Sequence, residues 1–348
     1  MFLKMSMFNV LVLEILLLVV VADAARTPKV LNETCIEDGS VGYVGGSPSG
    51  VLRTYAYQDS CPDAESIIFS WVENAVLNDP RMAASLLRLH FHDCFVNGCD
   101  ASVLLDDTSN FVGEKTAAPN VNSLRGFEVI DSIKSELESY CPGVVSCADI
   151  LAVAARDSVL MSNGPGWEVQ TGRRDSLTAS KAAANTNIPG PNSTAQTLVN
   201  MFQNVGLGLS DMVALSGAHT LGKARCSTFN SRLQTRKGDI NVDFLQSLQQ
   251  LCLVSNSNTN VVADLDLVTP ATFDNQYYVN LLSGEGLLPS DQVLVGGDVD
   301  QTSAIVRSYA EDEGAFFVDF IAAMIKMGSI GVLTENNGEI RHNCRVVN

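Results

Sequence analysis

Apolar side chains recur every three or four residues between positions 67 and 76, which predicts an amphipathic helix that ends before Pro80. This stripe consists of Ile67, Ile68, Trp71, Val72, Ala75 and Val76. A second stripe of the same period consists of Phe127, Ile130, Ile133 and Leu137. The sequence Cys141-Pro142-Gly143 ends this second helix, because proline and glycine do not continue helical structure.

Three further segments predict helices. Ser146 followed by Asp149 has the spacing of a capping box and predicts a helix that reaches toward Gly164. The other two are marked by apolar stripes, one ended by Gly206 and one late in the chain: Leu198, Met201, Phe202 and Val205, then Phe316, Phe317, Phe320, Ile321 and Met324. Alternating strand patterns are scarce. We therefore expect an all-α fold with minimal β-structure and a hinge between two helical lobes at residues 188–191.

The first 24 residues have the features of a signal peptide. Lys4 supplies the positive end, residues 10–21 form an apolar run that contains Glu14, and residues 22–24 fit a small-x-small cleavage site. A membrane anchor is the alternative, but it would need about 18–20 apolar residues. We expect residues 25–50 to form a flexible arm, because this stretch ends in a segment rich in Gly, Ser and Pro.

The net charge narrows the class of partner. The 348 residues are 46% hydrophobic and 18% charged, as in a folded globular protein. The formal net charge is −17; without the leader, 21 basic and 37 acidic residues remain and the charge is −16. Such a surface repels phosphate backbones and anionic lipid. We therefore expect no nucleic acid and no membrane among the partners.

Nine cysteines follow the leader, and in an exported chain they favour disulfides over metal thiolates. Because the number is odd, at least one cysteine is unpaired or pairs with another molecule. Asn32 and Asn192 each begin an N-x-S/T sequon and are candidate glycosylation sites, as expected of the same compartment.

Arg88, His90 and His92 lie in a run, residues 83–95, that is apolar on most faces and predicts a buried helix. Arg88 and His92 are four residues apart and share one face of that helix. Buried there, they need polar partners, which a purely structural role would also provide. A zinc site of His90 and His92 is disfavoured, because side chains two apart on a helix point in different directions.

Residues 210–220 carry another histidine of interest. Ser210 is expected to cap a short helix whose end brings His219 next to glycines. Taken alone, a histidine after an apolar helix is more often structural than a ligand.

Six motifs occur in order at residues 88–102, 126–131, 172–176, 213–222, 269–275 and 339–344. Together they resemble the secretory plant peroxidases, class III of the haem peroxidase superfamily, over about residues 52–348. The resemblance implies a haem peroxidase domain at residues 51–348. Its distal lobe would span about 51–190 and its proximal lobe about 191–330, with a haem between them and the C-terminal segment tied back to the distal lobe.

The resemblance also implies catalytic roles. His219 corresponds to the axial ligand of the iron of haem b, and Asp291 to the carboxylate behind it. His92 corresponds to the base that moves a proton between the two oxygens of peroxide. Arg88 would stabilise the negative charge that develops as the O–O bond breaks. Asn120 would hold His92 in place.

Other features follow from the same resemblance. Phe91 would line the distal face, and Pro189 would lie at the haem edge where aromatic donors approach. The implied disulfides are Cys61–Cys141, Cys94–Cys99, Cys147–Cys344 and Cys226–Cys252, which leaves Cys35 over. Gln234 departs from the family, which commonly has a tyrosine there.

Two sets of oxygen ligands match the two calcium sites of the family, and hard oxygen ligands suit Ca²⁺. The distal set is Asp93, Val96, Gly98, Asp100, Ser102 and Glu114. The proximal set is Thr220, Asp266, Thr269, Thr272 and Asp274. From the residues alone, a solvated polar loop would be the preferred explanation of each set.

The expected function is that of a donor:hydrogen-peroxide oxidoreductase, which reduces hydrogen peroxide to water and oxidises phenolic or aromatic donors by successive one-electron steps. We expect a monomer. The alternative, a secreted glycoprotein that binds the wall without catalysis, has no need of the complete set Arg88, His92, Asn120, His219 and Asp291. A metal-dependent hydrolase lacks a ligand cluster. The missing C-terminal extension favours the extracellular space over the vacuole.

Overall fold

The computed structural model describes residues 51–234, 240–253 and 261–348, which belong to one compact unit. The predictions for the leader, for the arm at 25–50 and for Cys35 and Asn32 lie outside these residues. The division into two lobes near residue 190 stays a prediction. In the part of the chain that the structure describes, no helix is both long and apolar enough to cross a membrane.

The described residues form thirteen α-helices and three short 3-10 helices. The α-helices are α2 (Ala64–Asn78), α3 (Arg81–Cys94), α4 (Phe127–Tyr140), α5 (Cys147–Met161), α6 (Lys181–Asn187), α7 (Ala195–Asn204), α8 (Leu209–Ser216), α9 (Asn230–Gln234), α10 (Val242–Leu253), α11 (Gln276–Leu282), α12 (Pro289–Gln292), α13 (Asp300–Glu311) and α14 (Glu313–Met327). The 3-10 helices are η1 (Ser102–Leu104), η2 (Gly217–Thr220) and η3 (Cys226–Thr228). The prediction of an all-α fold is confirmed.

Each apolar stripe of the sequence forms a helix, as predicted. The stripes correspond to α2, α4, α7 and α14, and the run at 83–95 corresponds to α3. Helix α5 begins where Ser146 was expected to cap it, since the Asp149 N–H donates to Ser146 Oγ at 3.1 Å. Gly126 precedes α4 with φ 96°, and a Cβ there would lie 2.9 Å from Leu86 Cδ2. A glycine is therefore needed where α4 starts against α3.

The predicted cap at Ser210 is wrong. Ser210 lies inside the first turn of α8, and Gly208 precedes the helix. The Gly208 N–H donates to Asp211 Oδ2 at 2.8 Å, so the acidic side chain three residues on closes this helix end. Helix α8 runs directly into η2, which carries His219.

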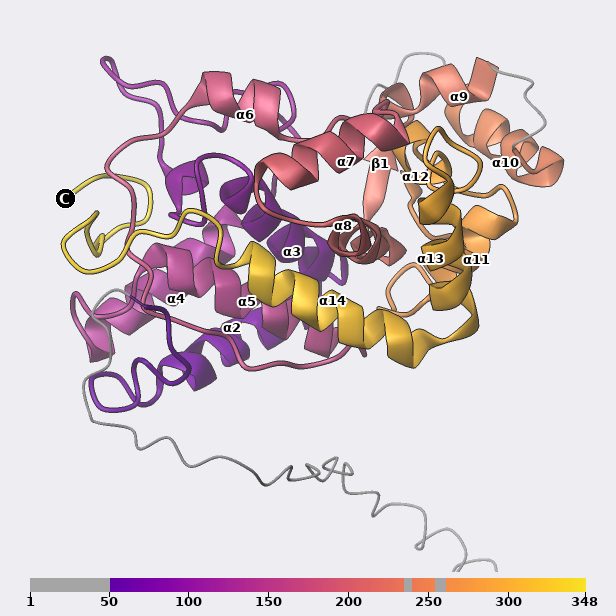
Figure 1. Cartoon of the computed structure of the whole chain (residues 1–348). Helices are drawn as coiled ribbons and strands as arrows, with labels where there is room; N and C mark the ends of the chain where they lie inside the picture. The colour runs from indigo at the N-terminus through magenta and orange to yellow at the C-terminus, as the bar shows by residue number, and fades with distance from the viewer. Residues whose placement is uncertain (1–50, 235–239, 254–260) are drawn as a thin grey trace, which may run out of the picture. The chain divides into compact units, whose positions relative to one another are not determined.

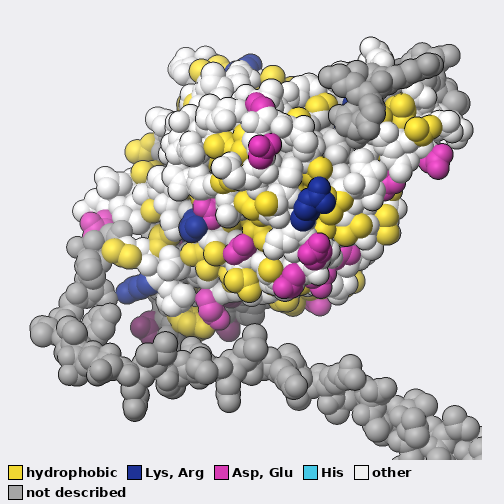
Figure 2. Space-filling view, turned by 45° about the vertical axis from the view of Figure 1, so that its right-hand side comes forward, with side chains coloured by type: hydrophobic (Ala, Val, Ile, Leu, Met, Phe, Trp, Pro, Cys, Tyr) yellow, Lys and Arg dark blue, Asp and Glu magenta, His cyan; other side chains and the backbone are white. Residues whose placement is uncertain are grey.

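Figure 1 shows α2, α3, α4 and α5 grouped together, with α9 to α13 at the other side and α14 running in front. One main apolar core includes buried residues of α2–α5, α7, α8, α11, α13 and α14. A smaller core lies around α9, α10 and β2, and its buried members are Phe229, Leu233, Phe244, Leu248, Ala263, Leu287 and Leu288. Figure 2 shows acidic side chains scattered over one face with fewer basic ones, in keeping with the negative net charge.

The β-structure of the described residues is small. Strand β1 (Lys223–Arg225) pairs antiparallel with β2 (Val262–Asp264), with Ala224 opposite Ala263. Four isolated bridges occur elsewhere, and two of them, at residues 174–333 and 175–339, join the C-terminal segment to the loop after α5.

The C-terminal segment is bound to the start of α5 through Asp175. The Asp175 carboxylate accepts the N–H groups of Cys147 and Ala148, the first two residues of α5, at 3.1 and 2.9 Å. It also accepts the Arg341 N–H at 3.0 Å. The Cys147–Cys344 disulfide closes the same junction. The fully buried Arg341 side chain donates to the carbonyls of Ala101, Ser176 and Cys344.

The structure contains the four disulfides that the resemblance implies. They span between 5 and 197 residues of sequence, and the shortest, Cys94–Cys99, closes the loop after α3.

Candidate active site

His92 lies near the end of α3 and is 4% exposed. Its Nδ1 atom lies 2.6 Å from Asn120 Oδ1. The Asn120 amide is oriented by a second hydrogen bond, from Nδ2 to the Glu114 carbonyl at 3.0 Å. Because Oδ1 can only accept, His92 Nδ1 must carry the proton and Nε2 keeps its lone pair. No hydrogen bond to Nε2 occurs within the described residues.

The surroundings of His92 keep it neutral. Burial lowers the pKa of His92 well below 6.5, and the positive charge of Arg88 lowers it further. The hydrogen bond to Asn120 acts in the opposite direction but is the smaller effect. At neutral pH this imidazole is therefore a base that is ready to accept a proton.

Arg88 is held by neutral oxygens. Its Nη atoms donate to the Ser123 and Pro119 carbonyls at 3.2 and 3.0 Å and to Ser123 Oγ at 3.2 Å. Burial, and then the charge of Arg225, lowers the pKa of Arg88 to about 10, so the side chain stays a cation at neutral pH. It forms no ion pair with any residue that the structure describes. Its charge is thus available to an anion that enters the site.

His219, like His92, is held by a hydrogen bond at its Nδ1 atom. Its Nδ1 atom lies 2.7 Å from Asp291 Oδ1, and Asp291 is 3% exposed in α12. The Asp291 carboxylate is fixed by the Leu288 N–H at 3.0 Å and by the Tyr277 hydroxyl at 3.2 Å. With Nδ1 donating to a carboxylate, Nε2 of His219 carries a lone pair that can bind a metal.

The electrostatics of His219 differ from those of His92. Burial alone would lower the pKa of His219, but the charge and the hydrogen bond of Asp291 outweigh it and raise the pKa above 6.5. His219 is half-buried, and 39% of its side-chain surface is accessible. The ring can therefore contact a bound group.

The distal set of predicted calcium ligands is buried and incompletely hydrogen-bonded. Asp93, Asp100, Ser102 and Glu114 are all at most 5% exposed. Among the described residues, no atom lies in hydrogen-bond geometry with Ser102 Oγ or with Glu114 Oε2. Burial raises the pKa values of Asp93 and Asp100, and it raises that of Glu114 to about 7. Buried carboxylates beside orphaned oxygens are stabilised by a cation, and their chemistry fits a hard one.

The loop between these residues is tightly folded. Asn97, Gly98 and Ala101 all have positive φ, at 67°, 124° and 60°. A Cβ on Gly98 would lie 2.5 Å from the carbonyl oxygen of Gly331, so only glycine fits there. The predicted ligands Val96 and Gly98 therefore lie in a loop that is fixed by both the Cys94–Cys99 disulfide and close backbone packing.

The proximal set also comes together. Thr220 Oγ1 donates to Asp266 Oδ2 at 3.1 Å and to Asp274 Oδ1 at 3.0 Å. Thr269 Oγ1 lies 3.2 Å from the same two oxygens. Thr272 has a backbone hydrogen bond, from its N–H to the Thr269 carbonyl at 3.1 Å, and its role as a ligand stays a prediction. Oxygen atoms of four residues thus converge beside His219, which directly precedes Thr220.

A third group contains His90, Cys94 and Cys99, whose ligand atoms lie within 4.8 Å of one another. The two sulfurs are bonded to each other, so no thiolate remains to bind a metal. His90 and His92 have different neighbours, as their spacing predicts: His90 Nδ1 lies 3.6 Å from Cys94 Sγ.

The structure also describes the predicted residues Phe91, Pro189 and Asn192. Phe91 is half-buried and packs on Phe95, with ring centroids 4.2 Å apart. Pro189 is half-buried between α6 and α7, and its role at a haem edge stays a prediction. Asn192 is exposed, as a glycosylation site must be.

Sequence reasoning missed Tyr277 and Arg225. Tyr277 shares Asp291 Oδ1 with His219, and its ring centroid is 6.2 Å from that of His219. Its position three residues after Asp274, in a motif already noted, is the signal that could have identified it. Arg225 affects the pKa of Arg88 from β1, and no pattern in the sequence relates these two arginines.

The chain is similar to one known protein family and to several of its members. The family model described as peroxidase matches residues 68–312. Peroxidase 40 of Arabidopsis thaliana is 62% identical over 335 residues, which cover 93% of this chain and 94% of that protein. Peroxidase 9 of Arabidopsis thaliana is 53% identical over 89% of this chain and 91% of its own length. Peroxidase 4 of Vitis vinifera is 54% identical, with 89% and 96% covered.

The chain belongs to the plant class III peroxidase family. Membership implies a haem prosthetic group and the oxidation of aromatic donors by hydrogen peroxide. The residues of this peroxidase fit a haem. An accessible imidazole with a free Nε2 is the ligand that haem iron takes in peroxidases. The neutral imidazole of His92 and the guanidinium of Arg88, which has no ion-pair partner among the described residues, provide the acid–base and electrostatic groups that peroxide cleavage needs.

Proposed function

We propose that this chain uses His92 and Arg88 to reduce hydrogen peroxide to water while His219 holds haem b, and that phenolic donors then return single electrons. The general activity follows from the family. The assignment of residues depends on one observation. Each of the two histidines donates Nδ1–H to a fixed oxygen, at 2.6 and 2.7 Å, and so keeps Nε2 for chemistry.

On the distal side, His92 Nε2 takes a proton from one oxygen of hydrogen peroxide and gives it to the other oxygen, which leaves as water. The low pKa of His92 ensures that the base is unprotonated when peroxide arrives. The Arg88 guanidinium lowers the energy of the negative charge that builds up during cleavage. Haem, when bound, supplies the iron that receives peroxide and stores its two oxidising equivalents.

On the proximal side, His219 Nε2 holds the iron. The hydrogen bond to Asp291 gives the imidazole part of the character of an imidazolate and makes it a stronger electron donor. The same hydrogen bond fixes the ring in the tautomer that can bind iron.

We further propose that two Ca²⁺ ions hold the two histidines in place. The distal ion would neutralise buried Asp93, Asp100 and Glu114, and the Glu114 carbonyl orients Asn120, which orients His92. The proximal ion would bind the cluster around Thr220, the residue after His219. The ions position the catalytic groups and take no part in the chemistry.

We place the protein outside the cell as a monomer. The signal-peptide features of residues 1–24 and the four disulfides support export, because such bonds persist in oxidising compartments. The exposed sequon at Asn192 agrees with the same route.

The test compares three histidine variants of the haem-loaded enzyme. His92→Ala should slow the reaction with peroxide by about 10²–10⁴-fold while the Soret band persists. His219→Ala should lose haem or bind it loosely. His342→Ala is the control, since its side chain is 67% exposed and its Nδ1 lies 3.0 Å from the half-buried Glu138 Oε2. A His92→Ala rate within a few-fold of the wild-type rate would remove His92 from the mechanism.

A further inference from the structure

Three tyrosines form a row of ring contacts that starts at the proximal histidine. The ring centroids are 6.2 Å apart for His219 and Tyr277, 5.1 Å for Tyr277 and Tyr278, and 5.1 Å for Tyr278 and Tyr309. All three pairs are edge-on contacts within the range of direct aromatic interaction. The three tyrosines are at most 2% exposed and come from α11 and α13. The row therefore runs from the proposed haem ligand in η2 through α11 to α13.

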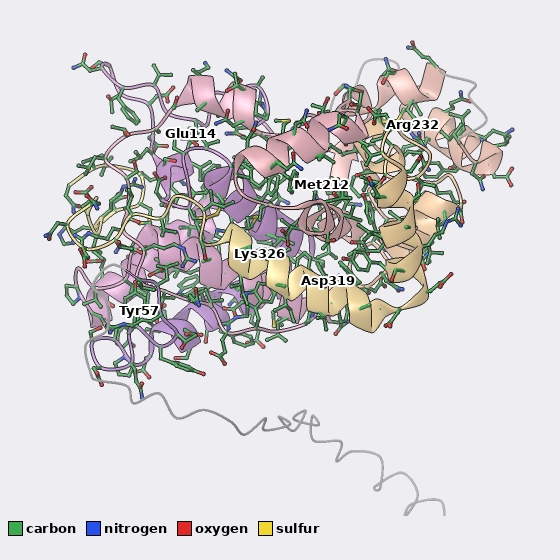
Figure 3. All side chains as sticks on the ribbon, in the orientation of Figure 1. Tyr57, Glu114, Met212, Arg232, Asp319 and Lys326 are labelled. Atoms are coloured by element: carbon green, nitrogen blue, oxygen red, sulfur yellow. A yellow bond between two sulfur atoms is a disulfide. The ribbon has the colours of Figure 1, made fainter. Side chains whose placement is uncertain are left out.

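The last tyrosine of the row has a proton acceptor at the surface. The Tyr309 hydroxyl donates to Asp319 Oδ2 at 2.6 Å, and Asp319 is an exposed residue of α14 (Figure 3). Burial, followed by the hydrogen bond and charge of Asp319, raises the pKa of Tyr309, so the phenol keeps its proton in the resting protein. Because its Oδ2 lies 2.6 Å from the hydroxyl oxygen and already accepts this hydrogen bond, the Asp319 carboxylate can take the proton when the phenol loses an electron.

The other two tyrosines are less suited to hold an oxidising equivalent. The Tyr278 hydroxyl donates to the carbonyls of Val213 and Ala214, which are poor proton acceptors. The Tyr277 hydroxyl donates to Asp291, but that carboxylate is 3% exposed and already accepts from His219 and Leu288. A proton transferred there would remove the charge that supports His219. An oxidising equivalent that reaches these tyrosines is therefore most stable on Tyr309.

We propose that Tyr309 and Asp319 form a second oxidation site, at the α13–α14 surface, for phenolic donors too large to reach the haem. This proposal rests on the proposed function, which supplies the oxidant. Glu311, Asp312 and Glu313 are exposed next to the start of α14, so the surface favours neutral or cationic donors over anionic ones.

The step balances without any further reagent. Tyr309 gives one electron through Tyr278, Tyr277 and His219 to the haem that peroxide has oxidised, and its phenolic proton passes to the Asp319 carboxylate. The product is a neutral tyrosyl radical beside a protonated carboxyl group. A donor phenol at the surface then gives one electron to Tyr309 and releases its own proton to solvent, while Asp319 returns the stored proton. The donor leaves as a phenoxyl radical.

The first test looks for the radical itself. The haem-loaded protein is mixed with hydrogen peroxide without donor, frozen rapidly and examined by electron paramagnetic resonance. We expect a tyrosyl signal that is lost in Tyr309→Phe and falls in Asp319→Asn, which keeps the ring but removes the base. The control is Tyr57→Phe, since Tyr57 has the same hydrogen bond to an aspartate, Asp149 Oδ2 at 2.5 Å, and lies well away from Asp319 (Figure 3).

The second test separates small donors from large ones. Ferrocytochrome c serves as a donor that cannot enter a haem pocket, and guaiacol as one that can. Tyr309→Phe and Asp319→Asn should lose oxidation of ferrocytochrome c and keep that of guaiacol, whereas Tyr57→Phe keeps both. A tyrosyl signal that persists in Tyr309→Phe, or undiminished oxidation of ferrocytochrome c, would overturn the surface site. Loss of guaiacol oxidation in His92→Ala would still support the proposed function in that case, so the two failures are distinguishable.

Discussion

Asn120→Asp should move the pH at which the enzyme loses its reaction with peroxide. In the protein, an uncharged amide oxygen lies 2.6 Å from His92 Nδ1, and burial together with Arg88 keeps the pKa of His92 well below 6.5. A carboxylate at the same place attracts the imidazolium, and an opposite charge at this distance typically shifts a pKa by about 1–3 units. Each unit corresponds to about 1.4 kcal/mol in favour of the protonated histidine.

The direction follows from the role of the base. Below its pKa, His92 is protonated and cannot accept the proton of hydrogen peroxide, so the rate falls as the pH falls. Because the variant raises this pKa, it should lose activity at a higher pH than the wild-type enzyme. On the acid side of the profile the rate changes about tenfold for each pH unit. At any given pH on the acid side, the variant should therefore react with peroxide about 10- to 1000-fold more slowly than the wild-type enzyme.

The assay is stopped-flow mixing of the haem-loaded enzyme with peroxide over about pH 4–8, followed at the Soret band. Asn120→Ala is the control, because it removes the hydrogen bond to His92 without adding charge and should not move the acid limb upward. If the acid limb of Asn120→Asp coincides with that of the wild type or lies at lower pH, the reasoning is refuted: either His92 is not the group that titrates, or Asn120 does not contact it in the working enzyme.

Three further results are expected. Asp291→Asn removes the charge behind His219 and should weaken haem binding by about 10- to 100-fold, measured as the rate of haem transfer to an apoprotein acceptor; unchanged transfer would contradict the role of Asp291. Exhaustive chelation, checked by elemental analysis, should lower both Tm and turnover before haem is lost, since a ligand at a hundredfold excess over its Kd stabilises the fold by about 2.7 kcal/mol; no change in either quantity would rule out structural calcium. Replacing Cys147 and Cys344 by alanine should cost about 5 kcal/mol and replacing Cys226 and Cys252 about 3.5 kcal/mol, because the first pair closes a span of 197 residues and the second a span of 26; denaturant unfolding that gives the reverse order would contradict this chain-entropy argument.

The sequence predicted the helices well wherever only one face of the helix is buried. Helices α2, α4, α7 and α14 each place an apolar stripe against the main core, and a period of three to four residues reveals such a stripe. Strands β1 and β2 are only three residues long, too short for an alternating pattern to be recognised. The start of α8 was misplaced because the capping group is the Asp211 side chain inside the helix, and capping by a glycine backbone leaves no polar residue in front of the helix to find.

The proposed site depended on the resemblance in a different way. The residues alone indicated that Arg88 and His92 share a helix face, but nothing local relates His92 to Asn120 or His219 to Asp291, which are 28 and 72 positions apart. The tautomers of both histidines follow only from the acceptors that the fold places at Nδ1. Tyr277 and Tyr309 were missed because each looks like an ordinary core aromatic until its hydroxyl partner is known.

The attachment of the C-terminal segment to Asp175 bears on how the chain is assembled during synthesis. Cys147, with its thiol, leaves the ribosome almost two hundred residues before its partner Cys344. Until then the Asp175 carboxylate can accept only the two N–H groups at the start of α5. The third donor, the Arg341 N–H, and the positive charge of Arg341 are added only when the C-terminal segment is made. On the proposed export route, Cys147 therefore has to stay unpaired in an oxidising compartment, although Cys141 lies only six positions before it. We expect correct pairing to depend on a disulfide isomerase, and the last residues made to be the ones that lock the first helices.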